Sequence, residues 1–156
     1  MIRVTRTKKP ALLADKEVNW RKDIRLASTE AARKHAQDRY KHEEIKKALI
    51  DMFHGKCAYC ESDITHIDYG HIEHFKPKGT PAYYELAVEW DNLLLACGRC
   101  NGAENKGTRF PLADKGGPLV NPVKEEPSKH LRFDFDPRLK LADVLGISKR
   151  GEITEK

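Results

Sequence analysis

The chain has 156 residues, of which 34% are charged, with a formal net charge of +5 and a mean hydropathy of −0.69. This length predicts one domain with a modest core, and no apolar run is long enough to cross a membrane. The basic N-terminus MIRVTRTKKPALL lacks the apolar stretch and small-residue cleavage site of a secretory signal, so we expect a cytoplasmic protein.

The positive charge is concentrated in the first third of the chain. Residues 1–56 contain fifteen Lys and Arg against eight Asp and Glu, whereas residues 57–156 contain fourteen against sixteen. A basic segment beside a near-neutral body suits binding to the phosphate backbone of nucleic acid. A solvated, charge-rich helix has the same composition, so charge alone leaves both interpretations open.

The first predicted element is a long helix that begins near Thr29 and ends at Gly55. Its sequence, TEAARKHAQDRYKHEEIKKALIDMFHG, is rich in helix formers, and Gly55 is a typical C-terminal cap. Apolar residues recur at helical spacing: Ile45, Ala48, Leu49, Met52 and Phe53. The exposed face carries basic residues that either follow phosphates or solvate the helix: Arg33, Lys34, Arg39, Lys41, Lys46 and Lys47.

Two C-x2-C pairs follow the helix, and they contain all four cysteines of the chain. Each pair, CAYC with Cys57 and Cys60 and CGRC with Cys97 and Cys100, can place two thiolates on one tetrahedral ion. Disulfides are the alternative, but we expect a reducing compartment, and a redox motif needs a single pair. We therefore expect a closed, structural zinc site that ties the two segments together.

The residues between the cysteine pairs predict a hairpin with a long connection. ESDITHIDYGHIEHF contains β-branched and aromatic residues and predicts a strand that ends near His74, before Pro77 and Gly79 open a loop. Leu93–Ala96, the run LLLA, predicts the second strand. Asn101, followed three residues later by Glu104, predicts the start of a short helix. The resulting fold class is α+β.

The C-terminal third carries weaker patterns. Proline-punctuated turns lead to alternating Leu131, Phe133 and Phe135, which predict a late strand or an extended segment packed on the core. The final residues are polar, and we expect them to be frayed. The predicted organisation is a basic helical arm at 1–55, a zinc-braced core with a C-terminal extension at 56–136, and a polar tail at 137–156.

CAYC, IEHFKP and WDNLLLACGRCN, with Lys106 close behind, resemble the HNH endonuclease family over residues 53–110. The resemblance implies a ββα-metal core braced by two zinc knuckles. It implies that His74 is the general base, that Asn92 braces the loop and orients this base, and that Glu73 and Asn101 hold a divalent cation. It also suggests substrate contacts from Lys76, Lys106 and His71.

Two positions depart from the family's usual residues. Glu73 stands where the family usually has Asp, and Asn101 stands where many members have His. Both ligands are then oxygen donors, so we expect Mg²⁺ or Mn²⁺ at the catalytic site. Because strand neighbours point to opposite faces, Glu73 and His74 can act on one phosphate only if the strand ends or distorts there.

Each of these residues also has a purely structural interpretation. His74 alone is more often a partly buried structural histidine. Asn92 is compatible with a turn before a strand, and Asn101 with a helix cap. His71 and Lys106 are compatible with ordinary solvent exposure.

The segment LVNP…EEPSKHLRF, together with IEHFKPK, is similar to one branch of the HNH family, found beside ATPases in anti-phage systems such as Septu and in some retron systems. This resemblance implies a DNA endonuclease with a large ATPase partner, and cleavage of both strands would require two sites, as in a homodimer. The alternatives are a non-catalytic zinc module that binds nucleic acid or protein, and a nuclease subunit that is inactive without its partner.

Overall fold

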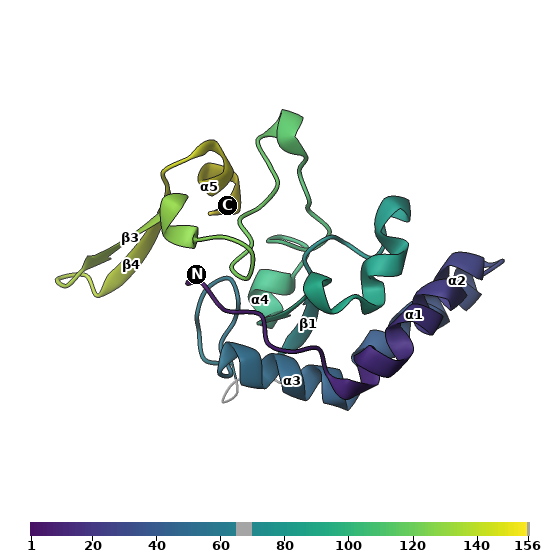
Figure 1. Ribbon diagram of the computed structural model, residues 1–156. Coiled ribbons are helices and arrows are strands. Elements are labelled where there is room, and N and C mark those ends of the chain that lie inside the picture. The colour runs from purple at the N-terminus through teal and green to yellow at the C-terminus, as the bar shows by residue number, and fades with distance from the viewer. Residues whose placement is uncertain (65–69, 156) are drawn as a thin grey trace. The chain divides into compact units, whose positions relative to one another are not determined.

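Helices form most of the first 53 residues in the computed structural model, which describes residues 1–64 and 70–155. Helix α1 spans Ala11–Leu26, α2 spans Glu30–Gln37 and α3 spans Glu43–Phe53 (Figure 1). The predicted single helix from Thr29 to Gly55 is wrong, because a 3-10 turn, η1 (Asp38–Lys41), and the extended backbone of His42 interrupt it. This break lets α2 pack against α1 while α3 packs against strand β2 (Leu93–Ala96).

Side chains cap the starts of α2 and α3. Thr29 accepts a hydrogen bond from the Ala32 amide at the start of α2, and His42 Nδ1 accepts one from the Glu44 amide at the start of α3. Helix α1 was not predicted from the sequence. Its buried residues, Leu13, Glu17 and Ile24, include an acid and are widely spaced, so α1 carries a weak apolar periodicity.

The predicted hairpin is confirmed for the described residues. Strands β1 (His71–His74) and β2 (Leu93–Ala96) pair antiparallel, with Glu73 opposite Leu94 and His74 opposite Leu93. Their connection contains the 3-10 helices η2 (Pro81–Val88) and η3 (Trp90–Asn92). Residues 65–69, which fall in the predicted first strand, lie outside the described residues.

A short helix, α4 (Gly98–Asn101), follows β2 directly. The prediction that a helix begins at Asn101 is wrong, because Asn101 is the last residue of α4. Cys97 is the N-cap, and its sulfur accepts a hydrogen bond from the Cys100 amide at 3.4 Å. The second cysteine pair therefore sets the start of this helix.

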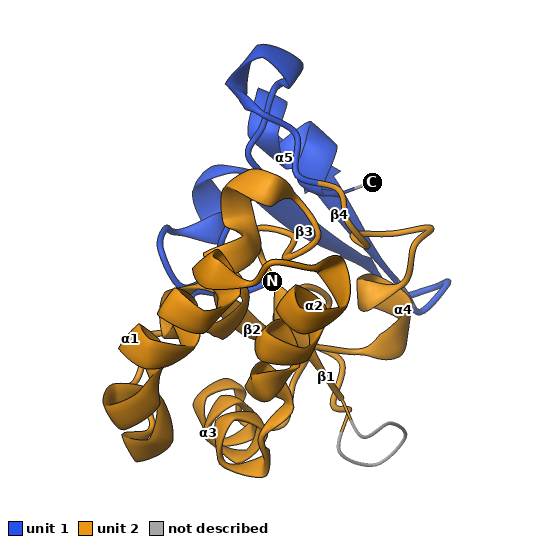
Figure 2. Ribbon diagram, turned by 90° about the vertical axis from the view of Figure 1, so that its right-hand side faces the viewer, with its two compact units in different colours: residues 1–4, 110–156 blue, residues 5–109 orange. Residues whose placement is uncertain are grey.

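Strand β2 is buried along its whole length and contacts α3, which contributes the fully buried Ile45 and Leu49. A second apolar cluster joins the arm to η2. It contains Ile24, Ala36, Ala87 and Val88, with Trp20, Tyr40 and Tyr84 packed against them. The arm and the hairpin thus belong to one compact unit, residues 5–109 (Figure 2).

Residues 1–4 and 110–156 form the other compact unit (Figure 2). The predicted late strand is confirmed as β3 (Leu131–Asp136), but Phe133 and Phe135 are exposed. Helix α5 (Lys149–Thr154) lies within the final residues, 148–156, that we expected to be frayed, and before it β4 (Leu141–Gly146) pairs antiparallel with β3. Backbone pairing with β3 and the Ser148 side chain, which caps α5, order these polar residues.

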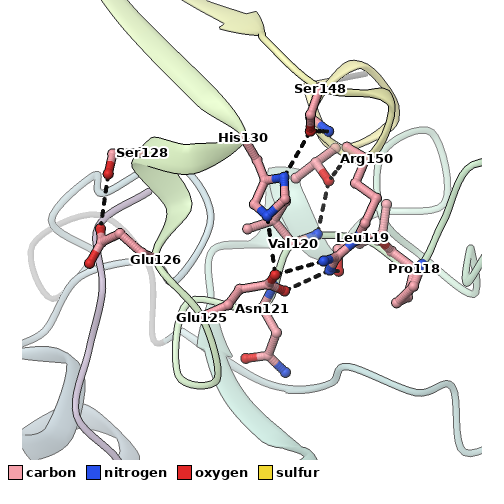
Figure 3. Close-up of polar contacts among 12 residues, drawn as sticks. Pro118, Leu119, Val120, Asn121, Glu125, Glu126, Ser128, His130, Ser148 and Arg150 are labelled. Atoms are coloured by element: carbon pink, nitrogen blue, oxygen red, sulfur yellow. Dashed lines mark hydrogen bonds and ion pairs between the residues drawn. The ribbon is translucent and has the colours of Figure 1, made fainter.

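A charged network holds this unit together (Figure 3). Arg150 donates to both carboxylate oxygens of Glu125 at 2.6 Å and to the Pro118 and Leu119 carbonyls. His130 lies between Glu125, at 3.3 Å, and Ser148, at 2.8 Å. Ser148, His130 and Glu125 are arranged in the order of a hydrolytic triad. However, Arg150 binds the Glu125 carboxylate, and the Ser148 hydroxyl caps helix α5. The network is therefore structural.

Within the described residues, no helix combines the length and apolar character that crossing a membrane requires.

Candidate active site and metal cluster

The four cysteines form one cluster, as the two C-x2-C pairs predict. The sulfurs of Cys57, Cys60, Cys97 and Cys100 all lie within 4.8 Å of one another. The Cys60 and Cys97 sulfurs are 3.9 Å apart, close to the separation of about 3.8 Å that Zn–S bonds of about 2.3 Å give in a tetrahedron. The cluster therefore fits a tetrahedral metal such as zinc.

Backbone hydrogen bonds fix both cysteine pairs. The Cys97 amide donates to the Cys57 sulfur at 3.3 Å, and the Ala58 amide donates to the Leu95 carbonyl at 2.8 Å, which attaches the first pair to β2. The short distances between the sulfurs also shift the pKa values of Cys60 and Cys100. Hydrogen bonding from Cys100 lowers the pKa of Cys60, while Cys57 and Cys60 raise the pKa of Cys100. A bound cation would allow all four to ionise together.

Glu73 lies on β1 and is buried, with 4% of its surface exposed. Its Oε1 accepts a hydrogen bond from Lys106 Nζ at 2.6 Å and lies 3.5 Å from the Tyr59 hydroxyl. Burial raises the pKa of Glu73, and the neighbouring Lys106 charge opposes that rise. The carboxylate thus already balances one positive charge in a buried position.

Tyr59 connects the cysteine cluster to this carboxylate. It stands between Cys57 and Cys60 in the sequence and donates its hydroxyl to Glu73. Burial and the charge of Glu73 raise the pKa of Tyr59 well above its ordinary value, so the hydroxyl stays protonated and remains a donor. The first cysteine pair therefore helps to position Glu73.

His74 ends β1 and is also buried, with 6% of its surface exposed. Its Nε2 lies 2.9 Å from the Ala87 carbonyl, which can only accept a hydrogen bond, so Nε2 carries the proton and the Nδ1 lone pair remains. The Tyr40 ring meets the imidazole edge-on, with centroids 4.4 Å apart. Burial lowers the pKa of His74 to about 4, which keeps the imidazole neutral near pH 7.

Asn92 fastens the chain that leaves β1. Its Oδ1 accepts from the Lys76 amide at 2.8 Å, and its Nδ2 donates to the Lys76 and Leu86 carbonyls at 3.0 and 3.1 Å. The Phe75 amide donates to the Asn92 carbonyl at 2.9 Å. This buried side chain therefore fixes the backbone on both sides of the connection that contains Ala87, the partner of His74.

The remaining predicted residues occupy different surroundings. Asn101 ends α4, and α4 contacts β1, the strand that carries Glu73. Lys76 is half-buried, with its Nζ 5.5 Å from the centre of the Tyr83 ring. His71 is exposed at the start of β1. Lys106 is buried and bonded to Glu73 and to the His74 carbonyl, at 2.7 Å, which its predicted role as a substrate contact did not anticipate.

Residues 57–107 match the HNH endonuclease family, the same family that the motifs in this segment resemble. The chain is also similar to Septu proteins. It is 35% identical to the Septu protein PtuB of Bacillus mycoides (strain KBAB4) over 162 residues, which cover 85% of this chain and 55% of that protein. It is 43% identical to the Septu protein PtuB of Bacillus thuringiensis over 103 residues, which cover 65% of this chain and 37% of that protein.

The chain thus spans about half the length of the first of these relatives and less of the second. No solved structure matches it. The family match leaves out the N-terminal arm, including Tyr40, which contacts His74.

Proposed function

We propose that the chain is a metal-dependent endonuclease that hydrolyses phosphodiester bonds in DNA and acts in anti-phage defence. The observation that carries the proposal is the state of His74 at the end of β1. The Ala87 carbonyl fixes Nε2–H, and burial keeps the ring neutral, so Nδ1 is available to take a proton from water. The family match and the two Septu relatives support the same activity.

The other residues have roles consistent with this chemistry. Glu73 and Asn101 supply the oxygen donors for a divalent cation, Mg²⁺ or Mn²⁺, which when bound would stabilise negative charge on the phosphate and the leaving oxygen. Asn92 keeps the connection to Ala87 in place and so orients His74. The four cysteines hold a structural zinc ion that fixes the two ends of the hairpin.

Strand neighbours point to opposite faces, and Glu73 and His74 accordingly have different side-chain contacts. The strand ends at His74, and the chain then turns under the control of Asn92. A strand end at this point is compatible with the proposal that both residues act on one phosphate.

The biological role includes a partner. The Septu relatives support the proposal that an ATPase subunit assembles with the chain and controls the nuclease. Cleavage of both DNA strands would require two active sites, supplied by a homodimer or by a larger assembly.

A plasmid cleavage assay with Mg²⁺ or Mn²⁺ tests the catalytic proposal. We expect metal-dependent nicking by the wild-type chain and a loss on the order of a hundredfold or more in His74→Ala, because the general base is gone. His35→Ala is the matched control, since His35 is an exposed histidine on α2. It should cut like the wild type.

Two other outcomes point to the alternatives. DNA binding without cleavage by the wild type, followed by cleavage when the ATPase partner is added, would identify a nuclease that depends on its partner. Binding without cleavage under both conditions would favour a non-catalytic zinc module. Equal cleavage by the wild type and His74→Ala would rule out His74 as the base.

A further inference from the structure

Two lysines flank the aromatic ring that contacts His74. The Nζ atoms of Lys78 and Lys41 lie 5.5 Å and 5.9 Å from the centre of the Tyr40 ring, and this ring meets the imidazole of His74 edge-on. Lys41 comes from the N-terminal arm, whereas Lys78 comes from the loop after β1. Segments far apart in the sequence thus bring positive charge to the ring that contacts the proposed general base.

One acid organises both ammonium groups. Asp38 Oδ2 lies 2.9 Å from Lys41 Nζ, and Asp38 Oδ1 lies 4.0 Å from Lys78 Nζ. The hydrogen bond from Lys41 lowers the pKa of Asp38, so this carboxylate is ionised near pH 7. One carboxylate facing two ammonium groups leaves an excess positive charge, and the charge of nearby Lys34 also acts on Asp38.

The position of Lys78 favours contact with an anion. Its side chain is 28% exposed, so the ammonium is reachable but partly shielded from water, and a charge contact there is stronger than on an open surface. The Lys78 backbone is fixed as well, because its carbonyl accepts a hydrogen bond from Gln37 Nε2 at 2.9 Å. Lys78 is therefore held in place from both ends.

We propose that Lys41 and Lys78 form a binding site for a DNA phosphate beside His74, with Tyr40 as the spacer between the lysines and the base. The inference rests on the proposed nuclease function and deepens it, because it assigns part of the substrate site to the N-terminal arm. Lys106, by contrast, is buried, and its Nζ lies 2.6 Å from Glu73 Oε1.

Binding of a short fluorescent DNA duplex tests this site, measured by anisotropy at several salt concentrations in the His74→Ala background so that the DNA stays intact. Lys78→Met and Lys41→Met each keep the aliphatic stem and remove the charge. We expect each to weaken binding on the order of tenfold and to reduce the salt slope by about one, as loss of one phosphate contact does. Lys78→Arg should restore most of the affinity, because it keeps the charge.

Lys22→Met is the matched control, since Lys22 is exposed on α1 and lies outside the cluster. It should change affinity by less than about twofold, and thermal melting of every variant should show an intact fold. If the wild type cuts DNA but Lys78→Met and Lys41→Met keep the parent's affinity and salt slope, this inference is wrong and the nuclease stands. If the wild type neither binds nor cuts DNA, the proposed function itself fails.

Discussion

Lys106 and Glu73 form a buried ion pair, with Nζ and Oε1 2.6 Å apart and each side chain 5% exposed. Lys106 also donates to the backbone carbonyl of His74. One ammonium group therefore neutralises the proposed metal ligand and holds the strand end that carries the proposed base. A divalent cation at Glu73 would have to share this carboxylate with Lys106 or replace the lysine.

Lys106→Met should destabilise the metal-free protein by about 3 to 5 kcal/mol, because it leaves a buried carboxylate without a counter-charge. Denaturant unfolding measures the loss. The double variant Glu73→Gln, Lys106→Met should recover much of it, since neither charge remains. Mn²⁺ should stabilise Lys106→Met more than the wild type, because the cation no longer competes with a lysine. Equal stability of Lys106→Met and the wild type would contradict the pair's proposed role.

The cysteine cluster should bind one zinc ion per chain, measurable by elemental analysis of the purified protein. Removing zinc with a strong chelator, or replacing Cys57 or Cys97 with Ser, should unfold the hairpin, because its two ends lose their common anchor. Loss of far-ultraviolet ellipticity on chelation, and its return when zinc is added back, would check this. A zinc-free protein with an unchanged melting temperature would contradict it.

The stability of the metal-free protein should fall as the pH drops from about 6.5 to about 4. His74 has a folded-state pKa of about 4, below its ordinary value of 6.5, so in this range the unfolded chain binds a proton that the folded chain does not. The part of the free energy of unfolding that depends on His74 protonation is fully present above the unfolded-state pKa and amounts to about 3 kcal/mol.

Unfolding of wild type and His74→Gln across this range measures the effect. The wild type should lose stability faster than His74→Gln as the pH falls. Protonation of His74 should also lower the cleavage rate at acidic pH, and this fall should occur well below pH 6.5. Parallel stability curves for the two proteins would show that His74 is not buried in its neutral form.

Arg150→Met should destabilise residues 110–156 by about 2 kcal/mol, because Glu125 loses both charge-assisted hydrogen bonds. Burial alone would raise the pKa of Glu125, but Arg150 and the Asn121 amide outweigh it and lower the pKa below the ordinary value of 4.5. The wild type should therefore lose this contribution as the pH falls below 4.5, whereas Arg150→Met should lose less. Hydrogen exchange in α5 measures both effects, and Lys149→Met, at an exposed neighbour, is the control.

The sequence was enough to predict features that short motifs encode. The four cysteines, the LLLA strand and the hairpin around them follow from spacing and apolar runs within a few residues. The break at His42 could not be predicted in this way, because helix formers continue through it and tertiary packing decides where α2 ends. Likewise, α5 and β4 owe their order to pairing with β3 and to capping rather than to apolar composition.

The residues of the candidate site also divide into those that sequence motifs indicate and those that only the three-dimensional structure reveals. Glu73, His74 and Asn92 could be singled out because they are close to a motif. Tyr40 could not, because nothing in its local sequence indicates that its ring meets His74. Lys106 was interpreted as a phosphate contact or a solvated lysine, whereas its burial depends on a charged partner on another element. Contacts of this kind become visible only in three dimensions.

The contact between Tyr59 and Glu73, and the start of α4 at Cys97, have a consequence for the order in which a new chain acquires its metals. Both proposed ligands of the catalytic cation, Glu73 and Asn101, are positioned by elements that the cysteine cluster anchors. We expect zinc to load first and Mg²⁺ or Mn²⁺ to follow. The proposed nuclease activity would then be absent from a freshly synthesised chain until zinc binds, however abundant magnesium is.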